Sequence, residues 1–187
     1  MTSARDFARG LYGVGLLYKF DARAWDFFDT SPRGFWNAYI VAVILSPLQL
    51  AHALLTFEPT KETLALVPFT IVDVLSYVVL WTLFPFVMMY IARLLGRAWR
   101  YLWYVVPYIW MQLPIGLVLY SVQLLNDFAV LPDVVVSVLN PLVLVTFAVY
   151  GTFVAGLGLQ ITTSTAVGLV VLDYVLGLIA QQLIAQI

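Results

Sequence analysis

After residue 34 the chain consists of long apolar runs separated by short polar stretches. Each run has about 20 residues or more, which is the length that a helix needs to cross a bilayer. The runs lack the strict alternation of apolar and polar residues that is typical of membrane-spanning strands. The pattern therefore predicts an all-α integral membrane helical bundle over residues 35–187, with five transmembrane helices. Their expected bounds are 35–57, 64–95, 101–125, 134–159 and 166–187.

Local signals mark several ends of these predicted spans. Ser31 followed by Pro32 is typical of a helix start, because serine caps free backbone N–H groups and proline fits the first helical position. The second span is longer than a straight crossing requires, and Pro85 predicts a kink within it. The uncharged stretch from Gln160 to Thr165 separates the last two spans.

The composition excludes several classes of protein. Of the 187 residues, 63% are hydrophobic and 10% are charged, whereas soluble domains average about 45–50% and about 25%. A soluble fold of this size has too little interior to hide that much apolar surface. The net charge of −1 gives no general basic surface for nucleic acid, so we expect no nucleic-acid partner. The chain has no cysteine, which excludes thiolate catalysis and cysteine-ligated metals.

Basic residues are unevenly distributed along the chain. Eight of the nine lysines and arginines lie before the first span or beside the loop between the second and third spans, and only Lys61 lies in the first loop. With five spans, those eight residues share one side of the membrane. The positive-inside rule then predicts a cytoplasmic N-terminus and a C-terminus outside.

Residues 1–34 form a candidate interfacial arm on the cytoplasmic side. On a helical wheel the basic residues Arg5, Arg9, Lys19 and Arg23 fall within roughly 80° of one another, and apolar residues gather opposite them. This layout favours an amphipathic segment in the membrane surface. Two roles are open: a sensor of lipid or docking site for a partner, or an anchor that packs on the bundle, which we favour.

The candidate functional residues inside the predicted spans are Asp73, Asp173 and Asn140. An unpaired carboxylate in the bilayer interior takes up a proton, and no lysine or arginine occupies the interior of another span. We therefore expect protonated aspartates that join helices by hydrogen bonds. The alternative is a proton relay or a cation site. The candidate hydrogen-bond partners are Ser76, Tyr77, Asn140 and Tyr174.

Small residues predict close contacts between helices. Gly151-x-x-x-Ala155 and Gly156-x-Gly158 lie in the fourth span, and Gly168 and Gly177 lie in the fifth. Residues without large side chains let helix backbones approach each other in membranes.

Motifs of catalysis are absent from the sequence. It contains no H-E-x-x-H, no G-x-S-x-G and no P-loop. His52 is the only histidine, and Glu58 and Glu62 are the only nearby residues that could complete a metal site with it. We therefore expect no enzyme activity, no cofactor and no metal, with His52 as an interfacial hydrogen-bonding residue.

Two short segments carry a resemblance to a known group of proteins. The stretch Asp29-Thr30-Ser31-Pro32-Arg33-Gly34-Phe35-Trp36 and the turn Ala92-Arg93-Leu94-Leu95-Gly96-Arg97 resemble uncharacterised bacterial Yip1-type membrane proteins. The resemblance implies five spans, a cytoplasmic N-terminus and location in a bacterial inner membrane. Eukaryotic relatives of that group are implicated in vesicle trafficking through an N-terminal region that engages small GTPases. The resemblance supplies no active site.

Two functions follow from these observations as hypotheses. The first is a non-enzymatic component that organises the membrane or binds a partner, including as a subunit of a larger complex. Its partners are the lipid bilayer and other membrane proteins or further copies of this chain. The second is a small transporter or proton-coupled permease that uses Asp73 and Asp173. A transporter needs a continuous polar cavity, whereas a partner-binding component needs only an adhesive surface.

Overall fold

The computed structural model describes residues 4–57 and 66–184, and within them all regular secondary structure is helical. Five segments are long and apolar enough to span a membrane, which confirms the predicted all-α membrane bundle. These segments are Pro32–Leu55, Phe69–Leu94, Ala98–Asp127, Asp133–Leu159 and Thr163–Ile184. The helices are α1 (Ala4–Leu17), η1 (Ala22–Phe27), α2 (Pro32–Ala38), α3 (Ile40–Leu55), α4 (Leu66–Leu94), η2 (Ala98–Arg100), α5 (Tyr101–Asp127), α6 (Asp133–Leu159) and α7 (Thr163–Ile184).

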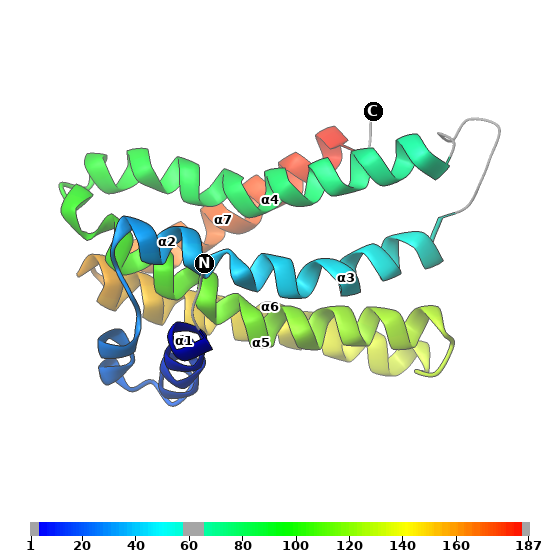
Figure 1. Ribbon diagram of the computed structural model, residues 1–187, viewed down its shortest axis with the longest axis horizontal. Coiled ribbons are helices and arrows are strands. Elements are labelled where there is room, and N and C mark those ends of the chain that lie inside the picture. The colour runs from blue at the N-terminus through cyan, green and yellow to red at the C-terminus, as the bar shows by residue number, and fades with distance from the viewer. Residues whose placement is uncertain (1–3, 58–65, 185–187) are drawn as a thin grey trace.

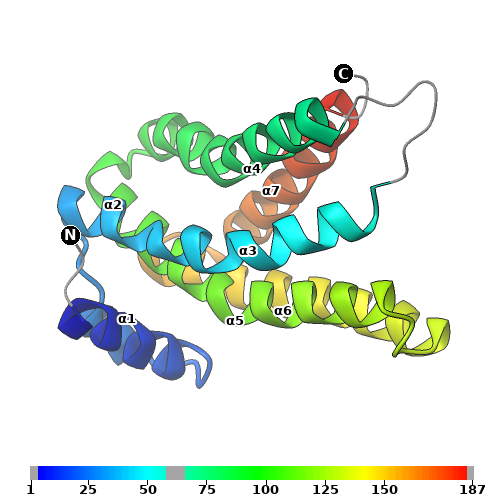
Figure 2. The same ribbon diagram turned by 45° about the vertical axis from the view of Figure 1, so that its right-hand side comes forward.

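Helix α5 is the centre of the bundle. It packs along α3 and α6 and also contacts α1, α2 and α4, and its residues from Tyr104 to Met111 are all buried. In Figures 1 and 2, α4 and α7 lie on one side of α3 and α5, and α1 lies on the other side. The helices around α5 expose rows of large apolar side chains, which suits a bundle surrounded by lipid.

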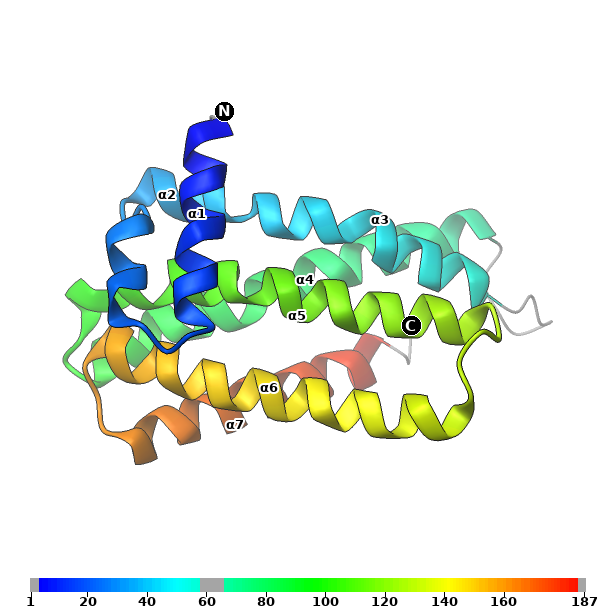
Figure 3. The ribbon, with the colours of Figure 1, turned by 90° about the horizontal axis from the view of Figure 1, so that it is seen from below.

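The two ends of the bundle differ in charge. The end that carries α1 and η1 also holds the junction between α4 and α5 and the turn between α6 and α7 (Figures 1 and 3). The basic residues of the described part of the chain belong to segments at this end: Arg5, Arg9, Lys19, Arg23, Arg33, Arg93, Arg97 and Arg100. Lys61 lies outside the described residues.

The first span is built from two helices, α2 and α3. The side chain of Ser31 accepts a hydrogen bond from the backbone N–H of Gly34, and Pro32 occupies the first turn, as the local sequence predicts. A Cβ atom on Gly34 would overlap the backbone of Asp29, so the tight start of α2 requires glycine. Tyr39 separates α2 from α3.

The N-terminal arm folds into two short helices instead of one. α1 ends at Leu17, and the chain reverses through Phe20, whose φ of 55° is in the left-handed region, before η1 begins. A single helical wheel over the arm is therefore wrong, because Lys19 and Arg23 lie beyond the end of α1. Figure 3 shows α1 running across the long axis of the bundle, which is the direction of a helix in the membrane plane.

Three long-range hydrogen bonds hold the arm to the bundle. The indole Nε1 of Trp25 donates to the carbonyl of Trp103 at 2.8 Å. The hydroxyl of Tyr18 donates to the carbonyl of Met111 at 3.0 Å, and the hydroxyl of Tyr150 donates to the carbonyl of Tyr18 at 3.0 Å. The arm is therefore a fixed part of the folded protein, joined to α5 and α6.

The surface of α1 has three faces. One face packs on the bundle, where a Cβ atom on Gly10 would overlap the ring of Trp110. A second face turns toward η1, where Nη2 of Arg9 donates to the carbonyl of Asp26 at 3.2 Å. The third face is apolar or small and is exposed, which suits contact with lipid. Its residues are Ala4, Ala8, Leu11 and Gly15.

Small residues bring α6 against its neighbours at two positions. A Cβ atom on Gly158 would lie 2.8 Å from Cα of Tyr104 in α5, and one on Gly151 would lie 3.1 Å from Cγ2 of Val170 in α7. These positions allow the close helix approach that the sequence predicts. Other predicted packing glycines have open space where a Cβ would stand: Gly156, Gly168 and Gly177.

Candidate functional site

Asp73 joins α4 to α3. Its two carboxylate oxygens accept hydrogen bonds from Nε2 of Gln49 at 2.9 and 3.1 Å. The prediction that Ser76 or Tyr77 bonds to Asp73 is wrong. The Ser76 hydroxyl donates to the carbonyl of residue 72 one turn back in its own helix, a common bond of serine in helices, and the longer Tyr77 side chain reaches the carbonyl of Ala42 in α3.

Asp173 joins α7 to α5. It lies at the middle of α7, and its Oδ2 accepts a hydrogen bond from the hydroxyl of Tyr108 at 2.7 Å. Tyr108 is buried in the row of residues at the centre of the bundle. Tyr174, another predicted hydrogen-bond partner of the aspartates, is 46% exposed and makes no hydrogen bond with another described side chain. Nothing in the local sequence marks Tyr108 as the partner of Asp173, because it stands in the apolar run of another helix.

A third polar pair joins the far ends of two spans. Nδ1 of His52 in α3 lies 2.6 Å from Oδ2 of Asp127 at the end of α5. The carboxylate is 8% exposed and the imidazole is 30% exposed. Glu58 and Glu62, the metal partners considered for His52, lie outside the described residues. Among the residues that the structure describes, no group of three metal-ligating side chains is present.

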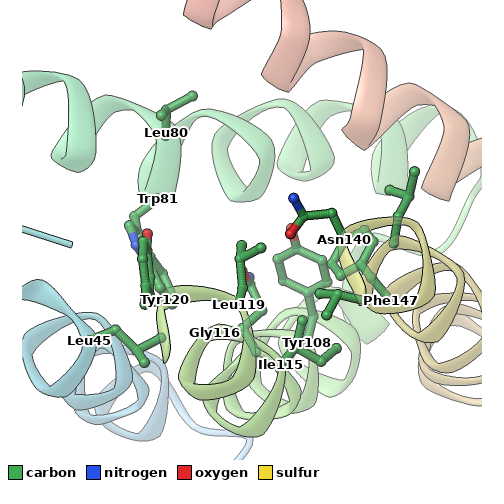
Figure 4. Close-up of a pocket in the computed structure, with 13 residues that line it drawn as sticks. Leu45, Leu80, Trp81, Tyr108, Ile115, Gly116, Leu119, Tyr120, Asn140 and Phe147 are labelled. Atoms are coloured by element: carbon green, nitrogen blue, oxygen red, sulfur yellow. The ribbon is translucent and has the colours of Figure 1, made fainter. Parts of the chain in front are cut away.

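A cavity of about 330 Å³ lies between α3, α4, α5 and α6 (Figure 4). Asn140 of α6 and Tyr108 of α5 both line it, whereas Asp173, which accepts the bond from the Tyr108 hydroxyl, does not. Asp73 does not line it. The three intramembrane candidates Asp73, Asp173 and Asn140 therefore do not converge on one cavity.

The cavity has a mixed lining. Aromatic rings from three helices form part of its walls: Trp81, Tyr108, Tyr120 and Phe147. Aliphatic side chains form most of the rest. Two amides, Gln112 and Asn140, also line it, and neither makes a hydrogen bond with a described residue. This arrangement provides hydrogen-bonding groups inside the membrane region that no part of the described protein uses.

The predicted basic arm residues are exposed and only loosely grouped. Arg5 and Arg9 lie on α1, and Lys19 and Arg23 lie after it. Arg23 forms an ion pair with Asp21 at 2.6 Å, and its hydrogen bonds lower the pKa of the Asp21 carboxyl below the ordinary value. The four basic residues therefore offer positive charge at one end of the bundle but no closed anion pocket.

Arg100 forms a contact that the sequence did not reveal. Its Nε donates to the carbonyl of Gly158 at 2.6 Å, and its Nη2 donates to the carbonyl of Leu157 at 3.3 Å. These carbonyls lie in the last turn of α6, where a cation also complements the helix dipole. The guanidinium stands over the rings of Trp99 and Trp103, at 5.0 and 5.4 Å from their centres. One arginine thus fixes the end of α6 to the start of α5.

The fold and these contacts define the class of the protein as a helical bundle of the multi-pass membrane type. No family model, curated protein or solved structure matches the chain.

Proposed function

We propose that this protein is a non-enzymatic membrane component that binds other membrane proteins or further copies of itself. We also propose that it lies in a bacterial inner membrane with its N-terminus in the cytoplasm and its C-terminus outside. The gathering of the described basic residues at the end with α1 and η1 supports this orientation. The Yip1-type resemblance of residues 29–36 and 92–97 supports the same plan.

One observation carries the choice of a binding component. Each intramembrane aspartate bonds to a neutral side chain of another helix: Asp73 to Gln49, and Asp173 to Tyr108. Polar groups that join neighbouring helices in this way stabilise a bundle. Asp73 joins α4 to α3, and Asp173 joins α7 to α5. Because the two acids lie on different helix pairs, they favour a rigid scaffold over a proton relay.

The composition of the particle in native membranes tests this proposal. The chain would be extracted from its membrane into lipid nanodiscs and the mass of the protein content compared with 21.0 kDa. We expect several copies, or a second protein in fixed stoichiometry. A particle that contains a single chain and lipid alone would contradict the proposal.

A proton-coupled transporter is the second candidate, and the cavity is the observation that favours it. Asn140 and Tyr108 line the cavity, and Tyr108 bonds to Asp173. Proton flux into proteoliposomes tests this candidate with the parent and Asp173→Asn. Flux that is present in the parent and lost in an equally stable Asn variant would establish transport; absence of flux in the parent favours the binding component.

A further inference from the structure

The cavity between α3, α4, α5 and α6 lies near the middle of the bilayer. At 1.5 Å per residue, Gln112 is about 17 Å from the start of α5 at Tyr101 and about 22 Å from its end. Leu80 and Trp81 are close to the midpoint of α4. A hydrocarbon core is about 30 Å thick, so charged lipid headgroups lie well outside this depth. The occupant of the cavity must therefore dissolve in the bilayer core.

The two amides of the cavity set the chemistry of the occupant. Gln112, which is partly buried, and Asn140, which is exposed, each carry two N–H donors and a carbonyl acceptor, and no described residue bonds to either. Unbonded amides are strongly disfavoured in hydrocarbon because no water replaces the missing partner. A ligand with oxygen acceptors inside the bilayer core satisfies these donors.

The walls of the cavity add a requirement of shape and charge. Figure 4 shows Trp81 and Tyr120 at one side and Tyr108 and Phe147 at another, so flat rings face the space from several directions. Aromatic rings stack on, or meet edge-to-face, another planar ring. None of the lining residues is acidic, basic or a histidine, so the lining provides no partner for a charged ligand.

We propose that this cavity binds a neutral, membrane-soluble molecule whose planar ring carries carbonyl oxygens, a chemistry that defines the quinone class. Gln112 and Asn140 donate to the carbonyl oxygens, and the aromatic side chains hold the ring. The volume of about 330 Å³ is at the lower end of the range for small-molecule sites, so it holds the ring and leaves an alkyl tail in the lipid. Leu144 lines the cavity and is 41% exposed, which places an opening on the lipid side.

This proposal is independent of the partner-binding role, because the cavity lies between the helices of one chain. It assigns the protein a ligand and includes no electron transfer. Tyr108 has a double place in the site: its ring lines the cavity and its hydroxyl is held by Asp173. The bond fixes the ring that the ligand contacts, so Asp173 is a positioning residue for the site.

Binding of two matched probes tests the proposal. The purified full chain in nanodiscs would be titrated with decylubiquinone, a benzoquinone with a ten-carbon tail, and with decylbenzene, which keeps a ring and the tail but lacks carbonyl oxygens. Native mass spectrometry counts the bound molecules. We expect one decylubiquinone per chain, and affinity for decylbenzene lower by about tenfold, the effect of one to two hydrogen bonds. Equal affinity for the two probes would overturn the proposal.

Variants of the lining locate the site. Gln112→Leu combined with Asn140→Leu should weaken decylubiquinone binding by at least about tenfold, because both donors are removed. Gln181→Leu is the control, since Gln181 is an exposed amide on α7 that does not line the cavity. Unchanged binding in a folded double variant would show that the ligand sits elsewhere.

A second pair of variants covers the case in which the double variant fails to fold. Leu144→Trp should block the cavity from its lipid side and abolish binding of one decylubiquinone per chain. Val145→Trp is the matched control, because Val145 is 57% exposed and does not line this cavity. Equal binding in these two tryptophan variants would also overturn the proposal.

Discussion

Trp25 supplies a hydrogen bond that Pro107 removes from helix α5. Proline has no backbone N–H, so the carbonyl of Trp103, four residues earlier, lacks its usual partner in the helix. The indole of Trp25 donates to that carbonyl at 2.8 Å. Ser46 has a similar place in α3, where its hydroxyl donates to the carbonyl four residues before Pro47 at 2.9 Å. These side chains complete the helices that proline interrupts.

Trp25→Phe should therefore destabilise the protein by about 1–3 kcal/mol, because it leaves a carbonyl without a partner in a partly buried place. Thermal unfolding in nanodiscs measures the loss. The matched test is Trp25→Phe in a Pro107→Ala background, where the alanine N–H restores the bond within α5. The penalty of the phenylalanine should shrink in that background, and an identical penalty in both backgrounds would assign the effect to ring packing.

Asp73 and Asp173 should act as neutral hydrogen-bonding residues. Asp→Asn at either position should be nearly silent in thermal stability, because the amide carbonyl still accepts the bonds from Gln49 or Tyr108. Asp→Leu should weaken the bundle by about 0.6–2 kcal/mol, the range for hydrogen bonds between membrane helices. A large loss of stability in the Asn variants would show that the charged carboxylate is the form that the bundle needs.

The helices meet at glycines whose environments differ sharply within the same element. In α6, Gly158 faces the backbone of Tyr104, whereas Gly156 has open space where a Cβ atom would stand. In α1, Gly10 faces Trp110, whereas Gly15 has open space. Gly156 in α6 and Gly15 in α1 therefore serve as control positions for substitutions at Gly158 and Gly10.

Gly158→Ala should destabilise the contact of α6 with α5 by about 1–3 kcal/mol, because the added methyl group lies against backbone that cannot rotate away. Gly156→Ala should be neutral or stabilising by up to about 1 kcal/mol, since alanine favours the helix over glycine. Thermal unfolding of the two variants provides the comparison. Equal effects would show that helix propensity, and not the packing of α6, determines the result.

Gly10→Ala should loosen the contact of the arm with α5, because the added Cβ atom would overlap the Trp110 ring. Gly15→Ala should leave this contact unchanged, because Gly15 has open space there. The readout is limited proteolysis at the arginines and lysine of the arm, which become accessible when the arm leaves α5. We expect faster cleavage in Gly10→Ala than in the parent and unchanged cleavage in Gly15→Ala. Equal protection in both variants would mean that the Trp110 ring moves to accommodate the methyl group.

At the scale of the whole molecule, the distribution of charge predicts the orientation in the membrane. The chain has no cysteine, so single-cysteine variants report one position each. Leu95→Cys, at the end with α1, should react with an impermeant thiol reagent only from the cytoplasm, and Val130→Cys, at the opposite end, only from outside. Labelling of Leu95→Cys from outside in intact cells would reverse the proposed orientation.

The length of the apolar runs is enough to predict the helical class and the five spans. In lipid every span must pair its own backbone N–H and C=O groups, which a helix does. The partners of Asp73 and Asp173 were not predictable, since Gln49 and Tyr108 lie on other helices and only tertiary packing selects them. The sequence pattern of the arm predicts one surface helix, whereas the chain reverses at Phe20. A left-handed phenylalanine gives no local sequence signal.

The bonds that hold the arm also set an order of events during synthesis. Trp25 meets Trp103, which lies 78 residues later in the chain, and Tyr18 meets Tyr150, which lies 132 residues later. At about 5–20 residues per second, the ribosome needs roughly 7–26 s to add that second interval. Within this interval α5 is made before α6, so the arm first lacks both helices and then has only α5 to pack on. Failed insertion of α5 or α6 would therefore leave a free arm as its first visible sign, open to proteases before the remainder of the chain is complete.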